Sequence, residues 1–297
     1  MSSQSEIERR LEIPGRVTFL DGNGGLRKVR IQSEGSEAEI YLHGAHVTHF
    51  QKKNEPPLLF LSEKSQYKDG QPIRGGVPVI FPWFGPKEGD TMHGFARLKT
   101  WELVSSNLNA DGSVGLEMKL PDCPERAKFP EFKLLFTATV GETLKMNLTV
   151  SNLSNRSFEF ETCLHTYFSI GAIGDVSIKG LQGRTYVDKV DNFAKKVETA
   201  DAIRVAGEVN RIYEDTSAAI DILDAKLGRK THVLAEGGTS TVVWNPWITQ
   251  AKAMTDFGDE EYKKMVCVES GNVAKNKLTL AAGASASLIV QLSSDKA

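Results

Sequence analysis

Apolar and polar residues alternate with a period of two along most of the chain, which is the pattern of strands with one buried face. The clearest example is a pair of runs, 132–140 and 144–150, on either side of Gly141-Glu-Thr, and it predicts a β-hairpin. Shorter runs of the same kind occupy residues 17–19, 29–31, 40–42, 116–120, 278–280 and 286–292. No segment shows a capped amphipathic helix of comparable clarity. We therefore predict an all-β, antiparallel fold with few short helices.

The predicted strands are spread evenly, and no linker, low-complexity tract or clean internal repeat divides them. We expect a single β-sandwich domain over residues 1–297, built from two large packed sheets, with a few flexible residues at its start. Two stretches break the alternation, a Pro/Gly-rich one from Gly75 to Gly89 and a charged one from Asp256 to Lys264. Loops carried on a rigid sandwich are where a site is usually assembled.

Charge and composition argue against a nucleic-acid-binding, membrane or secreted protein. With 36 basic and 38 acidic residues the formal charge is −2, so no global field attracts nucleic acid or an anionic membrane. No run is apolar enough to span a membrane, and the acidic N-terminal segment does not resemble a secretory signal or a mitochondrial presequence. The three cysteines lie far apart without a CxxC motif, as in a reduced protein. We expect a cytoplasmic monomer that binds neither nucleic acid nor membranes.

Two arginines are candidates for binding an anion. Arg74 stands directly before the glycine pair of IRGGVP, where the lack of side chains lets the backbone approach a ligand. Pro78 and Pro82 argue against a regular central strand in this segment. A guanidinium fork suits a carboxylate or a phosphate, although a surface salt bridge explains a single arginine equally well. Arg97, in MHGFAR, follows a second glycine-containing stretch, and two convergent arginines would form a dianion site.

Three histidines, His43, His46 and His49, lie close together in LHGAHVTH and at first suggest a metal site. If the segment is one strand, as residues 40–42 indicate, His46 faces away from His43 and His49, so the three cannot share one ion. We therefore expect no metal. The chain also lacks a glycine-rich phosphate loop and a G-x-S-x-G nucleophile motif.

Two further segments combine strand-forming residues with a group that transfers protons. His165, in ETCLHTYFSIG, is either a core histidine satisfied by one hydrogen bond or a catalytic group. Glu269 ends the strand-like run MVCVE before Ser-Gly, and is either an anchor for backbone amides or a base that faces a cleft. Trp244 and Trp247, in VVWNPW, are able to stack on a sugar ring, although core packing is the commoner fate of tryptophan.

The blocks IRGGVPVIFPWFG, HGFAR, LHTYF, TVVWNPW and MVCVESG, in this order, resemble the hexose-6-phosphate mutarotases of the galactose-mutarotase-like group, also called glucose-6-phosphate 1-epimerases. The similarity extends from about residue 38 to residue 292. The resemblance implies a large antiparallel β-supersandwich. It also implies an isomerase that interconverts the α and β anomers of glucose 6-phosphate and related sugar phosphates without a cofactor or a metal.

The resemblance also assigns roles to residues. In that family the histidine and the glutamate of the matching blocks are the general acid and the general base, which places these roles on His165 and Glu269. The two arginines hold the phosphate, which places that role on Arg74 and Arg97, and His93 of the same block is expected to bind substrate. We expect the imidazole and the carboxylate to face each other across one pyranose ring, with the guanidinium groups at the far rim.

Two positions depart from the family pattern. Met92 stands where glutamine is usual, and Asn210 stands where a substrate-binding aspartate is expected. The amide of Asn210 still accepts a hydrogen bond from a sugar hydroxyl but carries no charge. We keep Asn210 as a substrate-binding residue and expect altered hydroxyl recognition there.

Three other interpretations stay open. The chain is an aldose 1-epimerase for unphosphorylated sugars if the two arginines are structural, or a carbohydrate-binding protein if it keeps the sandwich without turnover. A retaining glycosidase needs two carboxylates roughly 5 Å apart, and only Glu269 is a candidate.

Overall fold

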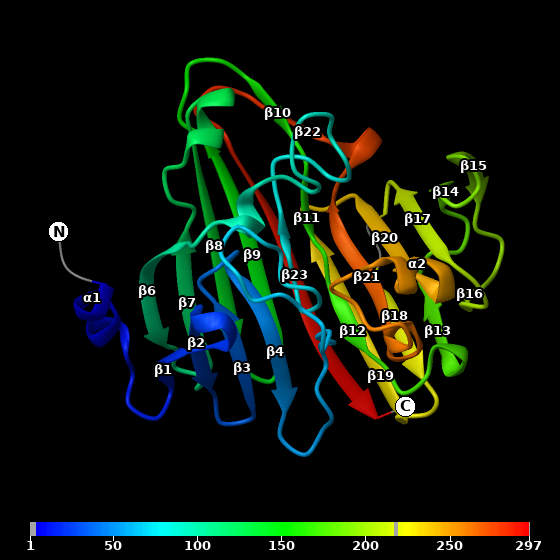
Figure 1. Cartoon of the computed structure of the whole chain (residues 1–297), viewed down its shortest axis with the longest axis horizontal. Coiled ribbons are helices and arrows are strands. Elements are labelled where there is room, and N and C mark those ends of the chain that lie inside the picture. Colours follow the sequence, from blue (N-terminus) through cyan, green and yellow to red (C-terminus); the bar gives the residue numbers. More distant parts are fainter. Residues whose placement is uncertain (1–3, 217–218, 297) are drawn as a thin grey trace.

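The computed structural model describes residues 4–216 and 219–296, and antiparallel strands are its main regular structure, as predicted (Figure 1). Near its start a four-stranded sheet has the order β1-β2-β3-β4. Its strands are β1 (Val17–Asp21), β2 (Arg27–Gln32), β3 (Ser36–Tyr41) and β4 (His46–Lys52). This sheet follows the sequence order, as expected of strands joined by short turns.

The largest sheet has nine strands in the order β16-β13-β18-β19-β23-β9-β8-β7-β6. They are β6 (Glu102–Leu108), β7 (Val114–Lys119), β8 (Phe132–Val140), β9 (Leu144–Asn152), β13 (Val176–Lys179), β16 (Ala202–Ile203), β18 (Ile220–Asp224), β19 (Arg229–Glu236) and β23 (Ser285–Lys296). The predicted hairpin is confirmed as β8 and β9, with Val140 opposite Leu144 at its turn. The longest strand, β23, lies in the middle and joins β19 to β9.

The second large sheet has eight strands in the order β15-β14-β17-β20-β21-β11-β5, with β12 also paired to β21. They are β5 (Val79–Ile80), β11 (Thr162–Leu164), β12 (Tyr167–Ser169), β14 (Thr185–Asp188), β15 (Ala194–Val197), β17 (Val209–Glu214), β20 (Ser240–Asn245) and β21 (Met265–Asn272). A small sheet pairs β10 (Phe158–Phe160) with β22 (Leu278–Leu280). The short β5 agrees with the two prolines that argue against a regular central strand.

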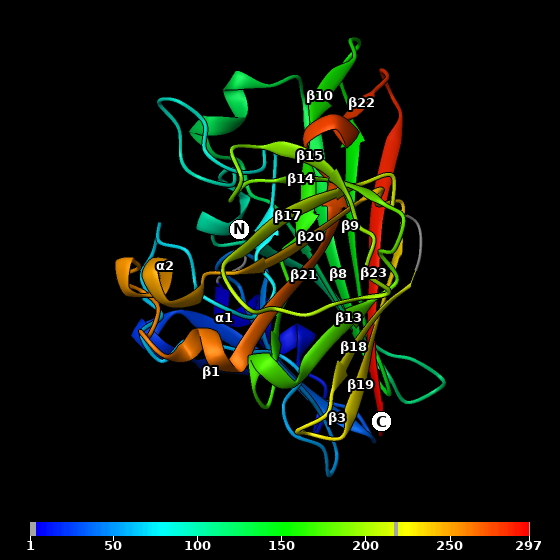
Figure 2. The ribbon, with the colours of Figure 1, turned by 90° about the vertical axis from the view of Figure 1, so that its right-hand side faces the viewer.

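The eight-stranded sheet lies against the nine-stranded sheet, and the main core fills the space between them (Figure 2). In β21, Val266 and Val268 belong to this core together with residues of the nine-stranded sheet such as Phe136. The alternate residues Met265 and Cys267 point the other way, into a second cluster against the helix α2. Every residue of β21 is buried because both faces of the strand are covered.

The helices are short, as expected. They are α1 (Gln4–Leu11) and α2 (Trp247–Ala253), together with the 3-10 turns η1 (Asn23–Gly25), η2 (Ala96–Leu98), η3 (Pro124–Lys128), η4 (Ile173–Asp175), η5 (Glu261–Lys264) and η6 (Ala274–Asn276). No helix of the described part of the chain has the length and apolar character that a membrane crossing requires.

The expected flexible residues at the start of the chain fall at least partly outside the described part. Residues 1–3 lie outside the described part, but residues 4–11 form α1. Leu11 is buried in the main core, and Glu8 forms a salt bridge with Arg27 of β2. That core cluster extends in sequence from Leu11 to Leu292, which favours the expected single domain.

Two local predictions were wrong. The segment 40–49 is not one strand: β3 ends at Tyr41 and β4 begins at His46, with a turn in which Gly44 and Ala45 have positive φ. The other concerns the glycine pair after Arg74, which does not line a ligand cavity. A side chain at Gly75 would meet the carbonyl oxygen of Phe60 at 2.5 Å, so the pair allows neighbouring backbones to approach each other.

Candidate active site

A cavity of about 410 Å³ opens on the face of the eight-stranded sheet that is turned away from the main core. Its volume is in the range of small-molecule sites. The walls include five of the six residues predicted from the sequence, Arg74, His93, His165, Asn210 and Glu269. The remaining wall residues are Phe84, Gly85, Pro86, Met92, Tyr167, Lys189, Val242, Trp244, Gln250 and Met254.

Glu269 reaches the cavity because of its position in β21. The strand continues to Asn272, so the glutamate lies inside the strand and does not end it, contrary to the prediction from sequence. Its side chain shares the outward face with Met265 and Cys267, and it stands opposite Val242 of β20. A strand covered on both faces holds this carboxyl group almost completely buried, at 1% exposure.

His165 lies in an interruption between two short strands, not within a strand as the sequence suggested. Its N–H donates to the carbonyl of Pro78 at 3.1 Å, while the strand pairing with β21 stops at Leu164 and resumes at Tyr167. The imidazole stacks on the ring of Tyr167, with centroids 4.8 Å apart. The interruption turns the imidazole toward β21 and the cavity.

The two proton-transfer groups are in direct contact. His165 Nε2 lies 3.2 Å from Glu269 Oε1, so the expectation of an imidazole and a carboxylate separated by a whole pyranose ring was wrong. Burial raises the pKa of Glu269 to about 8. Burial and then the charges of Arg97 and Arg74 lower the pKa of His165 well below its usual range. At neutral pH the pair therefore shares one transferable proton.

Arg74 is held at the wall of the cavity by two partners. Its Nε donates to Asp256 Oδ2 at 3.2 Å, its Nη2 lies 3.0 Å from the same oxygen as an ion pair, and its Nη1 donates to the hydroxyl of Tyr167 at 3.0 Å. Asp256 belongs to the charged stretch whose irregular conformation the sequence predicted. The contacts with Asp256 and Tyr167 hold the guanidinium group in place, and the N–H groups that they leave unbonded remain for a ligand.

Arg97 lies beneath this wall rather than on it. Its side chain is buried and its Nη2 donates to the carbonyl of Met92 at 2.8 Å, while its Nε has no partner among the described residues. Burial and the charge of Arg74 lower the pKa of Arg97 to about 10. The two arginines are therefore close enough to repel each other, which is the convergence that a dianion site requires.

His93 and Asn210 both line the cavity as predicted. His93 has a positive φ of 63°, and its Nδ1 accepts the backbone N–H of Gly85 at 3.0 Å. This leaves Nε2 of His93 as the protonated nitrogen. Asn210 stands in β17 opposite Trp244 of β20, and Trp244 is part of the cavity wall beside the imidazole of His165.

Sequence reasoning missed four residues of the site. Lys189 and Gln250 line the cavity, Tyr167 both stacks on His165 and binds Arg74, and Asp256 orients Arg74. The sequence contained a signal for two of them, because Tyr167 belongs to the LHTYF block and Asp256 to the charged stretch. Nothing in the spacing of Lys189 or Gln250 connects them to the other residues, because strand pairing brings in Lys189 and the packing of α2 brings in Gln250.

Among the described residues, one group of three has ligand atoms near enough to hold an ion. It consists of His165, Cys267 and Glu269, with all ligand atoms within 4.8 Å of one another. A cysteine binds metal as the thiolate, and burial raises the pKa of Cys267 well above its usual range, so this group fits a metal poorly. Of the three histidines considered earlier, His43 and His46 each donate from Nε2 to a backbone carbonyl at 2.7 Å.

Comparison with known proteins places these residues in a family context. Residues 27–293 match the aldose 1-epimerase family. A protein of Cenchrus ciliaris named "Putative glucose-6-phosphate 1-epimerase" is 35% identical over 262 residues, which cover 84% of this chain and 80% of that protein. An Escherichia coli protein of the same name is 36% identical over 245 residues, which cover 81% of each chain.

The fold is shared with solved structures. The crystal structure of "a putative mutarotase (YeaD)" from Salmonella typhimurium has a TM-score of 0.89 at 29% sequence identity, covering 97% of this chain and 96% of that chain. The crystal structure of HI1317 has a TM-score of 0.77 at 26% identity, covering 94% of this chain and 100% of that chain. These similarities confirm the predicted β-supersandwich.

Proposed function

Because the chain belongs to the aldose 1-epimerase family, we propose that it is a mutarotase for hexose 6-phosphates, with glucose 6-phosphate as the first candidate. The observation that carries this proposal is the contact of 3.2 Å between His165 Nε2 and Glu269 Oε1, in a cavity that Arg74 also lines. The names of the relatives from Cenchrus ciliaris and Escherichia coli support a phosphorylated substrate.

Interconversion of anomers needs two proton transfers, one at each of the two oxygen atoms bonded to C1. A base removes the proton from O1 while an acid protonates the ring oxygen O5, so that the C1–O5 bond breaks and the C1=O1 double bond forms. Rotation about C1–C2 and the reverse transfers then close the ring on the other face. O1 and O5 are both bonded to C1 and lie side by side. An acid and a base in direct contact are therefore well placed to reach both oxygens.

We assign Glu269 as the base that takes the O1 proton and His165 as the acid that protonates O5, with the roles exchanged on closure. The one proton shared by the pair is sufficient, because ring opening moves a proton onto one group and off the other. No covalent intermediate or change of redox state is involved. Each positioned transfer contributes roughly 10²–10⁴ in rate.

A phosphate at C6 supports this assignment of roles. After burial, the charges of Arg97 and Arg74 are the main causes that lower the pKa of His165. A phosphate dianion bound at these arginines offsets their charge, so the shared proton moves more readily to His165 in the occupied site. The phosphate is then expected to increase turnover as well as affinity.

The other interpretations fit less well. Among the described residues that line the cavity, Glu269 is the only carboxylic acid, whereas a retaining glycosidase needs two. A protein that binds carbohydrate without turnover does not require an acid and a base in contact. An unphosphorylated aldose offers no anion for the guanidinium group that Asp256 holds at the cavity wall.

The decisive experiment is NMR exchange spectroscopy on the α and β anomers of glucose 6-phosphate and of glucose, with and without the protein. We expect strong acceleration for the phosphate ester and a much smaller effect on glucose. His165→Ala and Glu269→Gln should each lower kcat roughly 10²–10⁴-fold while glucose 6-phosphate still binds.

The matched controls are His232→Ala and Glu236→Gln, both on β19 of the other large sheet, which should keep wild-type rates. Equal acceleration of glucose and glucose 6-phosphate would end the phosphate proposal. Wild-type turnover by Glu269→Gln would show that the base is another group.

A further inference from the structure

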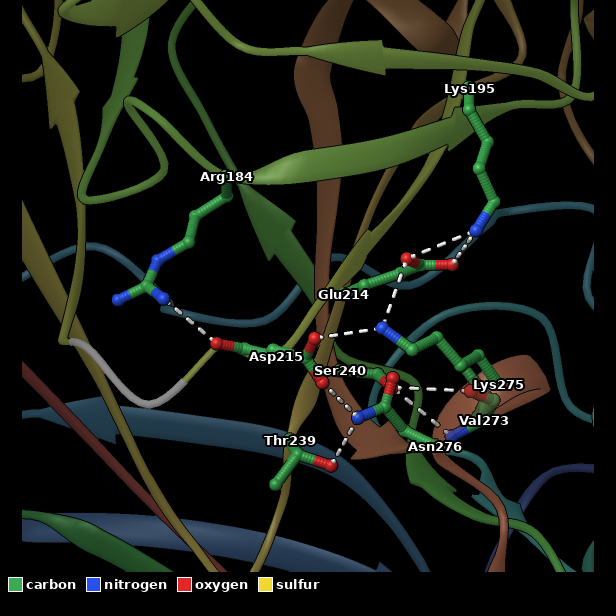
Figure 3. Close-up of polar contacts among 9 residues, drawn as sticks. All are labelled: Arg184, Lys195, Glu214, Asp215, Thr239, Ser240, Val273, Lys275 and Asn276. Atoms are coloured by element: carbon green, nitrogen blue, oxygen red, sulfur yellow. Dashed lines mark hydrogen bonds and ion pairs between the residues drawn. The ribbon is translucent and has the colours of Figure 1, made fainter.

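The hairpin formed by β14 and β15 carries three lysines, and only one of them faces the cavity. Lys195 lies 3.2 Å from Glu214 (Figure 3), and Lys196 lies 2.7 Å from Asp191. Lys189 begins the turn of the hairpin, is half-buried and lines the cavity. Its ammonium group has neither a hydrogen bond nor an ion pair within the described part of the chain. It lies over the ring of Phe84, another wall residue, whose centroid is 5.8 Å from Nζ. A half-buried cation at the wall of a ligand cavity, held against an aromatic ring, is arranged to meet a ligand.

Lys189 lies on the Glu269 side of the proton-transfer pair, because β14, which precedes it, is joined to β21 through β17 and β20, whereas His165 follows β11 at the other edge of β21. Burial raises the pKa of Glu269, and the charge of Lys189 opposes that rise. The arginines act on the other member of the pair, because their charges lower the pKa of His165. The backbone agrees with this placement. Lys189 donates its N–H to the carbonyl of Asn210 at 2.9 Å, and β17, which carries Asn210, is joined through β20 to β21.

These groups therefore follow an order along the eight-stranded sheet that matches a hexose 6-phosphate. Arg74 precedes β5, His165 follows β11, Glu269 lies in β21, and Lys189 follows β14. In the sugar the phosphate on C6 is next to C5, which carries O5, and O1 is the substituent of C1 on the far side of O5. With the phosphate at the arginines, O5 meets His165 and O1 meets Glu269, so the next group in the order is Lys189.

We propose that Lys189 contacts the anomeric oxygen O1 of the substrate and stabilises the negative charge that develops there, an inference that rests on the proposed mutarotase function. When Glu269 removes the O1 proton, charge develops on O1 before the C1=O1 bond is complete. When the ring closes, the same charge develops on the carbonyl oxygen before it is protonated. A cation in a site shielded from water stabilises both stages. The flexible stem of a lysine also follows O1 as it changes face.

The test compares Lys189→Met with Lys189→Arg and with Lys195→Met. Lys195 is the matched control because it lies on the same hairpin but has Glu214 as its partner. For glucose 6-phosphate, Lys189→Met should lower kcat roughly 10²-fold, while KM changes less than about threefold. Lys189→Arg should recover most of the rate, and Lys195→Met should behave as the wild type. Circular dichroism and thermal unfolding show whether each variant is folded.

Binding of a substrate analogue separates contact with O1 from contact with the phosphate. 1,5-Anhydroglucitol 6-phosphate lacks O1 and should bind equally well to the wild type and to Lys189→Met, as measured by calorimetry. A Lys189→Met variant that loses affinity for the analogue would place Lys189 at the phosphate and overturn the proposal. A variant with wild-type kcat would overturn it as well.

The pH profile supplies a readout that a merely structural lysine would not move. The titratable groups that face Glu269 are His165, Cys163 of β11, Cys267 of its own strand and Lys189. Lys189→Met removes the cation among these groups and should shift the alkaline limb of the kcat/KM profile to higher pH. An unshifted limb would contradict the proposed contact between Lys189 and O1. Failure of the wild type itself to accelerate anomerisation would instead reject the mutarotase function, and the role of Lys189 with it.

Discussion

Glu269 is a carboxyl group that the surrounding strands keep away from water and from direct ion pairs with lysine or arginine. Its Oε2 accepts only a weak hydrogen bond from Cys163 Sγ at 3.7 Å, and its Oε1 contacts His165. Such surroundings favour the neutral acid, which explains why its pKa is raised to about 8. In free enzyme the proton of the pair is therefore held near Glu269 until substrate enters.

We predict that kcat/KM for glucose 6-phosphate falls above about pH 8. A raised pKa means that the pair keeps its proton up to that pH and loses it beyond, after which no acid remains for O5. The profile should be measured from pH 7 to 9.5, where the phosphate stays a dianion, with the uncatalysed rate subtracted. A flat profile over this range would show that the proton on the pair is not required.

At the scale of single residues, sequence reasoning found the groups that belong to recognisable blocks and missed those that tertiary contacts bring in. His165, Glu269 and Arg74 stand in blocks with family counterparts, and all three line the cavity. Lys189 lies in a hairpin with several charged residues, and the local sequence does not distinguish it as a site residue from the other two lysines there. Only the pairing of β14 with β17 distinguishes Lys189 from Lys195.

At the scale of elements, the charged loop before β21 supports Arg74, which we propose binds the phosphate. It contains Asp256, which fixes Arg74, and Asp259, which forms an exposed ion pair with Lys64 at 3.4 Å. Arg74 is half-buried, so its ion pair with Asp256 is shielded from solvent more than the ion pair of Asp259 is. The two aspartates are thus a natural comparison within one loop.

Asp256→Asn is expected to raise KM for glucose 6-phosphate about 3- to 30-fold with little change in kcat, because the guanidinium group loses its orientation but not its charge. Asp259→Asn should leave both constants unchanged, because exposed ion pairs contribute little. Steady-state anomerisation kinetics measure both. A fall in kcat with unchanged KM for Asp256→Asn would place Asp256 in the chemical step instead.

Elements were predictable where alternation alone determines them. The hairpin of β8 and β9 repeats one buried and one partly exposed residue from end to end, and its register follows. The eight-stranded sheet offers less information, because β20 and β21 are buried on both faces and carry no alternation. The interruption at His165 could not be predicted from the sequence either, because the residues on both sides of it favour strands.

At the scale of the whole molecule, the acid–base pair lowers the stability of the fold. The pKa of Glu269 is about 8 in the folded chain, against 4.5 as its ordinary value. A raised folded pKa contributes stability that is fully present below pH 4.5 and is lost as the pH rises to about 8. The loss is on the order of a few kcal/mol.

Glu269→Gln should therefore unfold at a higher temperature than the wild type, with a difference that grows between pH 4.5 and 8 and is constant above. Thermal unfolding across this range measures the effect. Glu236→Gln, at an exposed position of β19, is the control and should give a difference independent of pH. A constant difference for Glu269→Gln would mean that the glutamate ionises normally inside the fold.

The central place of β23 has a consequence for biosynthesis. This strand pairs with β9 on one side and β19 on the other, yet a ribosome produces it after both. Until then β9 and β19 each present an unpaired edge, and such edges promote association between nascent chains. A translation product that stops short of residue 285 keeps both edges open, which makes it a natural client for chaperones.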